Sequence, residues 1–307
     1  MLSRLAESFF WMGRYIERAE GTTRLLLEFH QLLVQERGSD LNHGATLFLK
    51  NLGVEDVEGA MSDLPTLVST VYGSVGDGVP EPTSIVGALE AARANARSIR
   101  DALPADFFEV LNKANSLCHT APDFQSPGAH LREVLATLAV VHGTFDWVAT
   151  RDEAYSFYEI GSSLERLDLV ARLLNMRMER TWIEQGPATM LRSVGALSAY
   201  LRRHERLTGA SARAFLATEA TFPRSLRATS TKCRAALASI ALGTRMRAEP
   251  LVNGVGLLET YLSYWDPSQG DEEISQLVNR ALLAVESTSA AVGDTFFRPI
   301  GTIVWSQ

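Results

Sequence analysis

A charged motif that occurs twice is the part of this chain best suited to chemistry. Each copy has a glycine, a Glu-Arg step, a second acid and a further arginine at the same spacing. The two copies are Gly13, Glu17, Arg18, Glu20 and Arg24, and Gly161, Glu165, Arg166, Asp168 and Arg172. Guanidinium groups and carboxylates in one place could bind a carboxylate or phosphate, or transfer a proton through a glutamate of raised pKa.

The spacing of the motif places its charged groups together on one face of a helix. At about 100° per residue, Gly13, Glu17, Glu20 and Arg24 fall within a sector of roughly 60°, and the second copy does the same. A glycine inside a helix costs about 1 kcal/mol relative to alanine, so its recurrence indicates close approach of a neighbouring helix or a ligand. Because the first helix is apolar around most of its girth, we expect these charges to be partly buried and paired.

Two interpretations of the repeated charges remain open. In the structural one, Glu20–Arg24 and Asp168–Arg172 are i,i+4 pairs, and the other two acids bind arginines from neighbouring helices. In the functional one, the two helices line a shared groove, with Glu17 or Glu165 as candidate general acid/base and an arginine steadying an oxyanion. The candidate ligand-binding residues are Arg14, Glu17, Arg18, Glu20, Arg24, Arg151, Asp152, Glu165, Arg166, Asp168, Arg172 and Arg224.

A metal site is a third interpretation of the same acids. Glu17-x-x-Glu20 and Glu165-x-x-Asp168 each put two acids on one helix face, as in di-metal carboxylate bundles. Those bundles also take histidine from Glu-x-x-His, and none of the six histidines of this chain has that spacing. An arginine beside nearly every acid also opposes cation binding. We therefore predict no metal site and no cofactor.

Two further segments carry charges that could join such a site. Arg151-Asp152-Glu153 precedes the second copy and either caps its helix or places charges at the mouth of the groove. Phe222-Pro223-Arg224-Ser225 reads as a proline-initiated helix whose free N–H groups could also receive an anion beside Arg224. The glycine-rich stretch from residue 73 to 82 lacks the lysine and the strand context of a phosphate-binding loop.

Composition narrows the class of protein. A hydrophobic content of 46% and a charged content of 21% are typical of a soluble globular protein. The net charge of −7 argues against a nucleic-acid-binding surface. No uncharged run approaches the roughly 18 residues of a membrane span, and no secretion signal is evident, so a cytoplasmic location is expected. Cys118 and Cys233 are expected to be buried free thiols.

The hydrophobic periodicity predicts an all-α protein, a multi-helix bundle of ten or more helices. The predicted helices span residues 3 to about 36, about 84–102, 104–119, 128–149, 151–184, 187–208, a segment starting at 223, and about 271–292. The repeat predicts two pseudo-symmetric halves, about 1–149 and 150–307. Since no long linker separates them, we expect one integrated domain over 1–307.

The chain resembles a known family at the residues that carry these motifs. Its opening, Leu2-Ser3-Arg4-Leu5-Ala6-Glu7 followed by residues 11–20, is similar to that of the bacterial Alpha-E domain proteins, which are all-helical. The middle motif resembles Thr150-Arg151-Asp152-Glu153 with Leu164-Glu165-Arg166, and the late motif resembles residues 222–225. Ser162-Ser163 departs from the pattern, because arginines are common there in the family.

The resemblance implies a biological context. Alpha-E proteins are typically encoded beside, or fused to, circularly permuted ATP-grasp ligases and transglutaminase-like peptidases, which are the expected partners. The leading hypothesis is a non-catalytic helical binding or accessory component of an ATP-grasp-linked peptide ligation or modification system, holding a peptide or amino acid in a Glu/Arg-lined groove. The alternatives are an enzyme acting on an amide or peptide bond through Glu17 or Glu165, and a purely structural scaffold.

Overall fold

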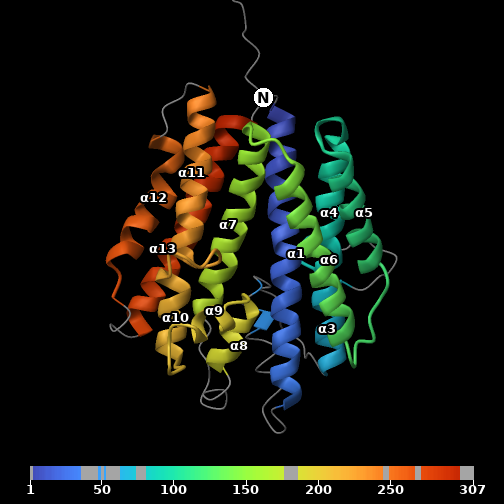
Figure 1. The fold of residues 1–307 in the computed structure, drawn as a ribbon, viewed down its shortest axis with the longest axis vertical. Helices are drawn as coiled ribbons and strands as arrows, with labels where there is room; N and C mark the ends of the chain where they lie inside the picture. Colours follow the sequence, from blue (N-terminus) through green and yellow to red (C-terminus); the bar gives the residue numbers. More distant parts are fainter. Residues whose placement is uncertain are drawn as a thin grey trace, which may run out of the picture.

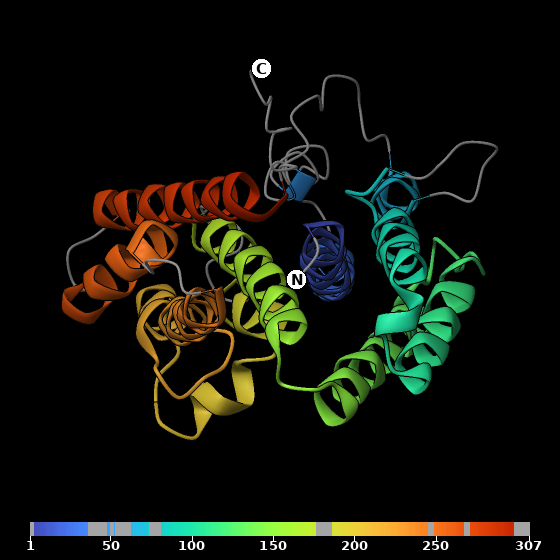
Figure 2. The ribbon, with the colours of Figure 1, turned by 90° about the horizontal axis from the view of Figure 1, so that it is seen from above.

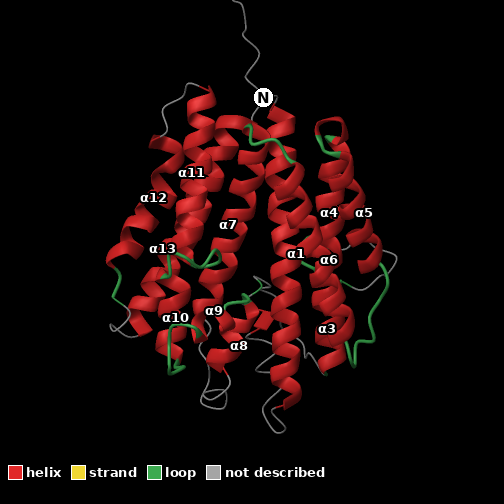
Figure 3. Ribbon diagram, in the orientation of Figure 1, coloured by secondary structure: helices red, strands yellow, loops and turns green. Residues whose placement is uncertain are grey.

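The computed structural model describes residues 3–35, 48–49, 52, 63–73, 81–175, 186–244, 249–266 and 271–297. Every regular element in this part of the chain is helical, which confirms the all-α prediction (Figure 3). Most of the predicted loop from residue 73 to 82, the end of the predicted helix 151–184 and the C-terminal tail lie outside the described residues.

The described residues form twelve α-helices and two short turns of other helix types. The α-helices are α1 (Ser3–Gln35), α3 (Leu64–Tyr72), α4 (Ile85–Ser98), α5 (Ala105–Cys118), α6 (Gly128–Val148), α7 (Glu153–Asn175), α8 (Gly186–Ser193), α9 (Leu197–Leu201), α10 (Gly209–Thr218), α11 (Leu226–Thr244), α12 (Glu249–Tyr264) and α13 (Asp271–Val292). A 3₁₀ turn (Arg100–Ala102) follows α4, and a π turn (Gly293–Phe297) follows α13. None of these helices combines the length and the apolar character that crossing a bilayer requires.

Helices α1 and α7, which carry the two copies of the motif, lie side by side at the centre of the molecule (Figures 1 and 2). On one side α1 packs against α4 and α6, and α5 contacts both of these helices. On the other side α7 packs against α11 and α13, and α12 contacts both. Each central helix is therefore the inner member of a group of four.

An apolar stripe forms the buried face of α1. Phe9, Met12, Ile16, Ala19 and Leu26 are all buried, at spacings of three, four or seven residues. Each large apolar side chain buried in this way stabilises the fold by about 1.5–3 kcal/mol. This stripe and the matching one on α7 make the two central helices the inner wall of the core.

A pair of glycines sets how closely α1 and α7 approach. A Cβ atom added at Gly13 would overlap the carbonyl oxygen of Tyr158, and one added at Gly161 would overlap that of Phe10. The two backbones therefore touch where the repeated glycines lie. The sequence indicated that either a neighbouring helix or a ligand approaches these glycines, and in the structure it is the neighbouring helix.

Three predicted helices differ from those observed. The helix expected over about 84–102 ends at Ser98, and a 3₁₀ turn follows it. The helix expected over 187–208 is broken after α8, because Gly195 has a φ of 71°, in the left-handed region that favours glycine. The helix expected to open at Pro223 begins at Leu226 instead. The hydroxyl of Ser225 accepts a hydrogen bond from the amide of Ala228 at 3.0 Å, so Ser225 is the cap and Arg224 lies in the preceding turn.

Candidate functional site

The two Glu-Arg steps of the sequence bind each other across the α1–α7 contact. Arg166 donates from Nε to Oε1 of Glu17 at 2.7 Å and from Nη2 to Oε2 at 2.6 Å. In the opposite direction, Arg18 donates from Nε to Oε1 of Glu165 at 2.5 Å and from Nη2 to Oε2 at 3.0 Å. Each glutamate thus forms a bidentate pair with the arginine of the other step, the strongest arrangement for these groups.

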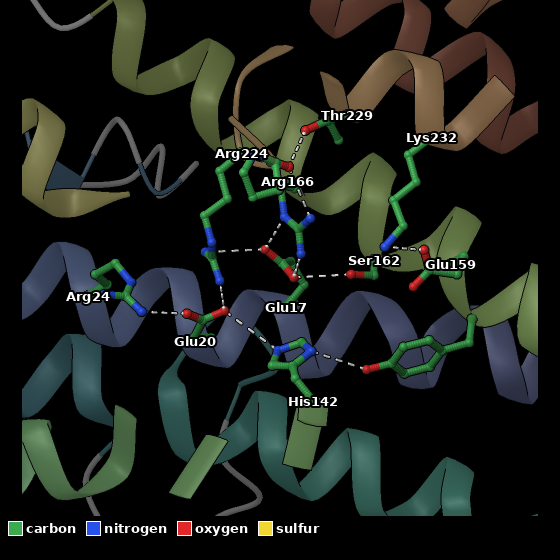
Figure 4. Close-up of polar contacts among 12 residues, drawn as sticks. Glu17, Glu20, Arg24, His142, Glu159, Ser162, Arg166, Arg224, Thr229 and Lys232 are labelled. Atoms are coloured by element: carbon green, nitrogen blue, oxygen red, sulfur yellow. Dashed lines mark hydrogen bonds and ion pairs between the residues drawn. The ribbon is translucent and has the colours of Figure 1, made fainter. Parts of the chain in front are cut away.

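Further partners of Glu17 form the first of two charged clusters, which we call the Glu17 cluster (Glu17, Glu20, Arg24, Arg166 and Arg224; Figure 4). Arg224 reaches from the turn before α11, pairs with Glu20 and lies 3.6 Å from Glu17. Arg24 binds the other oxygen of Glu20 at 2.7 Å, the i,i+4 pair expected from the sequence. Ser162 donates a hydrogen bond to Glu17 at 3.0 Å. The two acids are only 2% and 3% exposed, so these donors replace water around them.

His142 of α6 also faces this cluster. Its Nε2 lies 3.5 Å from Glu20, and its Nδ1 lies 3.4 Å from the hydroxyl of Tyr158 (Figure 4). Glu17, Glu20 and His142 present oxygen and nitrogen atoms within 4.8 Å of one another, a grouping that no sequence spacing indicated. Arg166 and Arg224 pair with the carboxylates that a cation would need, so these side chains suit guanidinium better than metal.

The second cluster, which we call the Glu165 cluster, consists of Arg14, Arg18, Glu165, Asp168 and Arg172. Arg14 adds a third hydrogen bond to Glu165, from Nε at 2.8 Å. Arg172 binds both oxygens of Asp168, at 2.8 and 3.2 Å, which is the second expected i,i+4 pair. No hydrogen bond or ion pair between described residues joins the two clusters. The repeated charges therefore form two separate clusters.

The charge state of the buried acids follows from their partners. Burial alone would raise the pKa of Glu17, but Arg166 and Arg224 together hold that pKa well below its usual range. Burial would also raise the pKa of Glu165, but Arg18 and Arg14 outweigh the effect of burial and lower that pKa. Burial lowers the pKa of His142, which keeps its ring neutral near pH 7. Each cluster then holds three positive and two negative groups at neutral pH, a net charge of one positive.

A cavity of about 250 Å³ lies against the Glu165 cluster. We call it the Arg18 cavity. Its polar wall comes from one face of each central helix: Arg14, Arg18 and Thr22 of α1, and Glu165, Asp168 and Arg172 of α7. Residues four apart share a face of a helix, which explains why these side chains point into one space. All five members of the Glu165 cluster line it.

Two of the predicted ligand-binding residues do not belong to either cluster. Arg151 is exposed, stacks on the ring of Tyr155 and pairs with Asp146 at 2.8 Å. Asp152 accepts a hydrogen bond from the amide of Tyr155 at 3.2 Å, which is the capping role that the sequence also allowed. At the helix start beside Arg224, the Ser225 hydroxyl binds one of the free N–H groups, that of Ala228, and Arg224 itself pairs with Glu20.

An acid/base role for the candidate glutamates would need a carboxylate that is not held by arginine. Among the described residues, Glu17, Glu20, Glu165 and Asp168 are each paired with at least one guanidinium group. A carboxylate whose pKa is lowered in this way is a weak base near neutral pH. The observed pairing therefore favours binding or structure over proton transfer.

Several residues at the clusters carry no obvious sequence signal. His142 and Tyr158 have no motif of their own, and only the packing of α6 brings His142 to the acids. Ser162 had a signal, because it occupies the place of Arg14 in the second copy of the motif. Both side chains donate to the glutamate of the opposite helix, Arg14 to Glu165 and Ser162 to Glu17. Thr22 lies one helical turn beyond Arg18 and lines the cavity.

Comparison with known proteins places the chain in a family. An uncharacterised protein of Mycobacterium bovis is 26% identical over 183 residues, and two uncharacterised proteins of Mycobacterium tuberculosis match equally. These alignments cover 53% of this chain and 21% of each relative, so the chain spans about a fifth of the length of the curated relatives it matches. No solved structure matches the chain significantly. Residues 1–297 match the Alpha-E family, described as a predicted alpha-helical domain with a conserved ER motif. Because this match covers nearly the whole chain, the protein belongs to the Alpha-E family.

Proposed function

We propose that this protein is a non-catalytic helical binding component of an ATP-grasp-linked system that ligates or modifies peptides. The observation that carries the proposal is the Arg18 cavity, in which three arginines and two acids already paired with them face one space of about 250 Å³. Charged groups fixed by mutual pairing are suited to orient a ligand, whereas a general base must be free to accept a proton. The ligand class expected there is a peptide or an amino acid.

We also infer that the chain consists of two related halves, about 1–149 and 150–307, joined into one domain. The packing order supports this inference, since α1 with α4, α5 and α6 makes the same contacts as α7 with α11, α12 and α13. The contacts of the motif support it as well: the glycines touch reciprocally and the Glu-Arg steps exchange partners. A ligand site at the α1–α7 contact would then lie between the halves.

The proposed partners are an ATP-grasp ligase, a transglutaminase-like protein, or both. The usual context of Alpha-E proteins suggests them, and the relatives are long enough to carry further domains beside the matched part. Cytoplasmic location belongs to the same proposal, because a ligase that consumes ATP acts where ATP is supplied.

A reconstitution experiment tests the partner. The tagged protein would be expressed at its native level in its own host and purified with whatever binds it, and proteins in the eluate would be identified by mass spectrometry. We expect an ATP-grasp ligase in the eluate, and a one-to-one complex when the two purified proteins are mixed and analysed by size-exclusion chromatography with light scattering. Absence of the complex with purified components would contradict the proposal.

A purely structural scaffold is the second candidate, favoured by the pairing of all four repeated acids. It predicts neither a ligand in the cavity nor a stoichiometric ligase complex. The two candidates therefore differ in measurable binding, while both accept that the charged clusters stabilise the fold.

A further inference from the structure

The positive charge of the Glu165 cluster is concentrated on one side of the Arg18 cavity. Asp168 forms its ion pair with Arg172, whereas Glu165 is shared by Arg14 and Arg18. The excess guanidinium charge therefore belongs to the α1 wall. These two arginines are partly buried, with side-chain exposures of 12% and 24%, so solvent only partly screens that charge.

A threonine hydroxyl on the same wall has no partner in the described structure. Thr22 is 2% exposed and lines the cavity, yet its hydroxyl makes no hydrogen bond to any described residue. The hydroxyl oxygen of Thr22 is not sealed from the cavity, so water or an acceptor atom of a ligand can take its hydrogen bond there. Thr22 lies four residues after Arg18, on the same face of α1.

A second threonine extends this donor surface. Thr83 lines the cavity at its solvent-exposed edge, where its hydroxyl is open to water. It directly precedes Ser84, which caps α4 by accepting a hydrogen bond from Gly87 at 3.1 Å. The start of a helix carries a partial positive charge, so the α4 dipole adds to the field at this edge of the cavity. Guanidinium groups, two hydroxyls and a helix start all favour an anion.

We propose that the Arg18 cavity binds the terminal carboxylate of an amino acid or a short peptide, with Thr22 and Arg18 as its donors. The inference rests on the proposed function and names the group of the ligand that the cavity binds. A carboxylate carries one negative charge, which matches the net charge of the cluster. A doubly charged phosphate would leave one negative charge uncompensated in this partly buried space, beside Glu165 and Asp168. A cavity of about 250 Å³ has room for about eight water molecules, and thus for a dipeptide-sized ligand.

A matched pair of variants tests the assignment. Thr22→Val removes the hydroxyl in the cavity and keeps the shape of the side chain. Thr23→Val removes the neighbouring hydroxyl, which donates to the carbonyl of Ala19 within α1 at 2.6 Å and is not part of the cavity wall. Both residues are buried on the same helix, so the pair separates loss of the ligand contact from a general effect on the helix.

The titration uses the full chain without any ligase. Binding of glycylglycine, glycylglycinamide and inorganic phosphate would be followed by ligand-observed NMR on the unmodified protein and both variants. We expect glycylglycine to bind, and Thr22→Val to weaken that binding about tenfold or more, since a hydrogen bond to a charged group is lost. We expect Thr23→Val to leave it unchanged. Glycylglycinamide, which lacks the carboxylate, should bind about tenfold more weakly or not at all.

Three outcomes would overturn the inference: no binding of glycylglycine at millimolar concentration, equal loss in the two variants, or tighter binding of phosphate than of the dipeptide. Because no ligase is present, failure here is distinct from failure of the proposed function. If the protein forms the ligase complex normally but does not bind dipeptides, the proposed partner stands and only the proposed ligand is ruled out.

Discussion

Both carboxylate oxygens of Glu17 are bound by Arg166, a residue of the opposite central helix and of the other half of the chain. Adjacent residues on a helix point about 100° apart, so Glu17 cannot pair with its own neighbour Arg18. That arginine binds Glu165 instead. The two Glu-Arg steps therefore fasten α1 to α7 in one register, next to the glycines where the backbones touch.

Removing the negative charge of Glu17 should lower the free energy of unfolding. In Glu17→Gln, Arg166 and Arg224 stay charged but lose the buried carboxylate of Glu17. Breaking a buried ion pair in this way typically lowers the free energy of unfolding by about 3–5 kcal/mol. Urea unfolding followed by circular dichroism measures the change. The control is Glu259→Gln, which breaks the pair of Glu259 with the exposed Arg234 and should cost about 1 kcal/mol or less. Equal midpoints for the unmodified protein and Glu17→Gln would show that the Glu17 cluster does not stabilise the fold.

A methyl group at the contact of the central helices should also destabilise the protein. Gly161→Ala places a Cβ atom against the carbonyl oxygen of Phe10, and relieving that overlap requires α1 and α7 to separate. We expect a loss of about 1–3 kcal/mol or more, as for other overpacked sites. Gly143→Ala on α6 is the matched control, because nothing lies within 4 Å of its added Cβ. There alanine should stabilise the helix by up to about 1 kcal/mol, and a similar result for Gly161→Ala would disprove the close contact.

Stability should fall as the pH is lowered. The pKa of Glu17 and that of Glu165 are lower in the folded protein than in the unfolded chain, where a glutamate has a pKa of about 4.3. Their contribution is therefore fully present above about pH 4.3 and is lost as the pH falls toward the folded pKa. The pKa of His142 is also lower in the folded protein, so its protonation favours the unfolded chain and reduces stability further below about pH 6.5.

Urea unfolding at a series of pH values between 3 and 7 measures this dependence. Each group that titrates differently in the two states contributes up to about 1.4 kcal/mol per pH unit. Glu165→Gln removes one such group, so its stability should fall less steeply below about pH 4.3 than that of the unmodified protein. Parallel curves of stability against pH for the two proteins would mean that the pKa of Glu165 is not lowered in the folded protein.

The two cysteines should be unreactive in the folded protein. Both are buried free thiols, as the sequence predicted, and burial raises the pKa of Cys118 to about 12 and that of Cys233 further still. A thiol reacts as its thiolate, so neither should react with Ellman's reagent at pH 8 until the protein is unfolded. Two thiols per chain should then react in urea. Rapid reaction of one thiol without denaturant would show that the helix covering it opens.

Hydrophobic periodicity was sufficient to predict the positions of the long amphipathic helices. The predicted helices at 104–119, 128–149 and 271–292 agree with α5, α6 and α13 to within one or two residues at each described end. The break at Gly195 was missed, because a glycine with positive φ looks the same in sequence as one inside a helix. Helices α3, α10 and α12 were not predicted, and each is shorter than 17 residues, so its periodicity extends over few turns.

The sequence by itself determined the helical class, the positions of the repeated charges, and the two i,i+4 pairs, because all of these depend on contacts within one helix. Only the tertiary structure decided that Glu17 binds Arg166 and Arg224, that His142 joins Glu20, and that the charges form two clusters with a cavity beside one of them. The partners of these groups lie on other helices, and the register and crossing of those helices come from packing. Helical periodicity gives the direction of a side chain around its own axis, but not the helix that it meets.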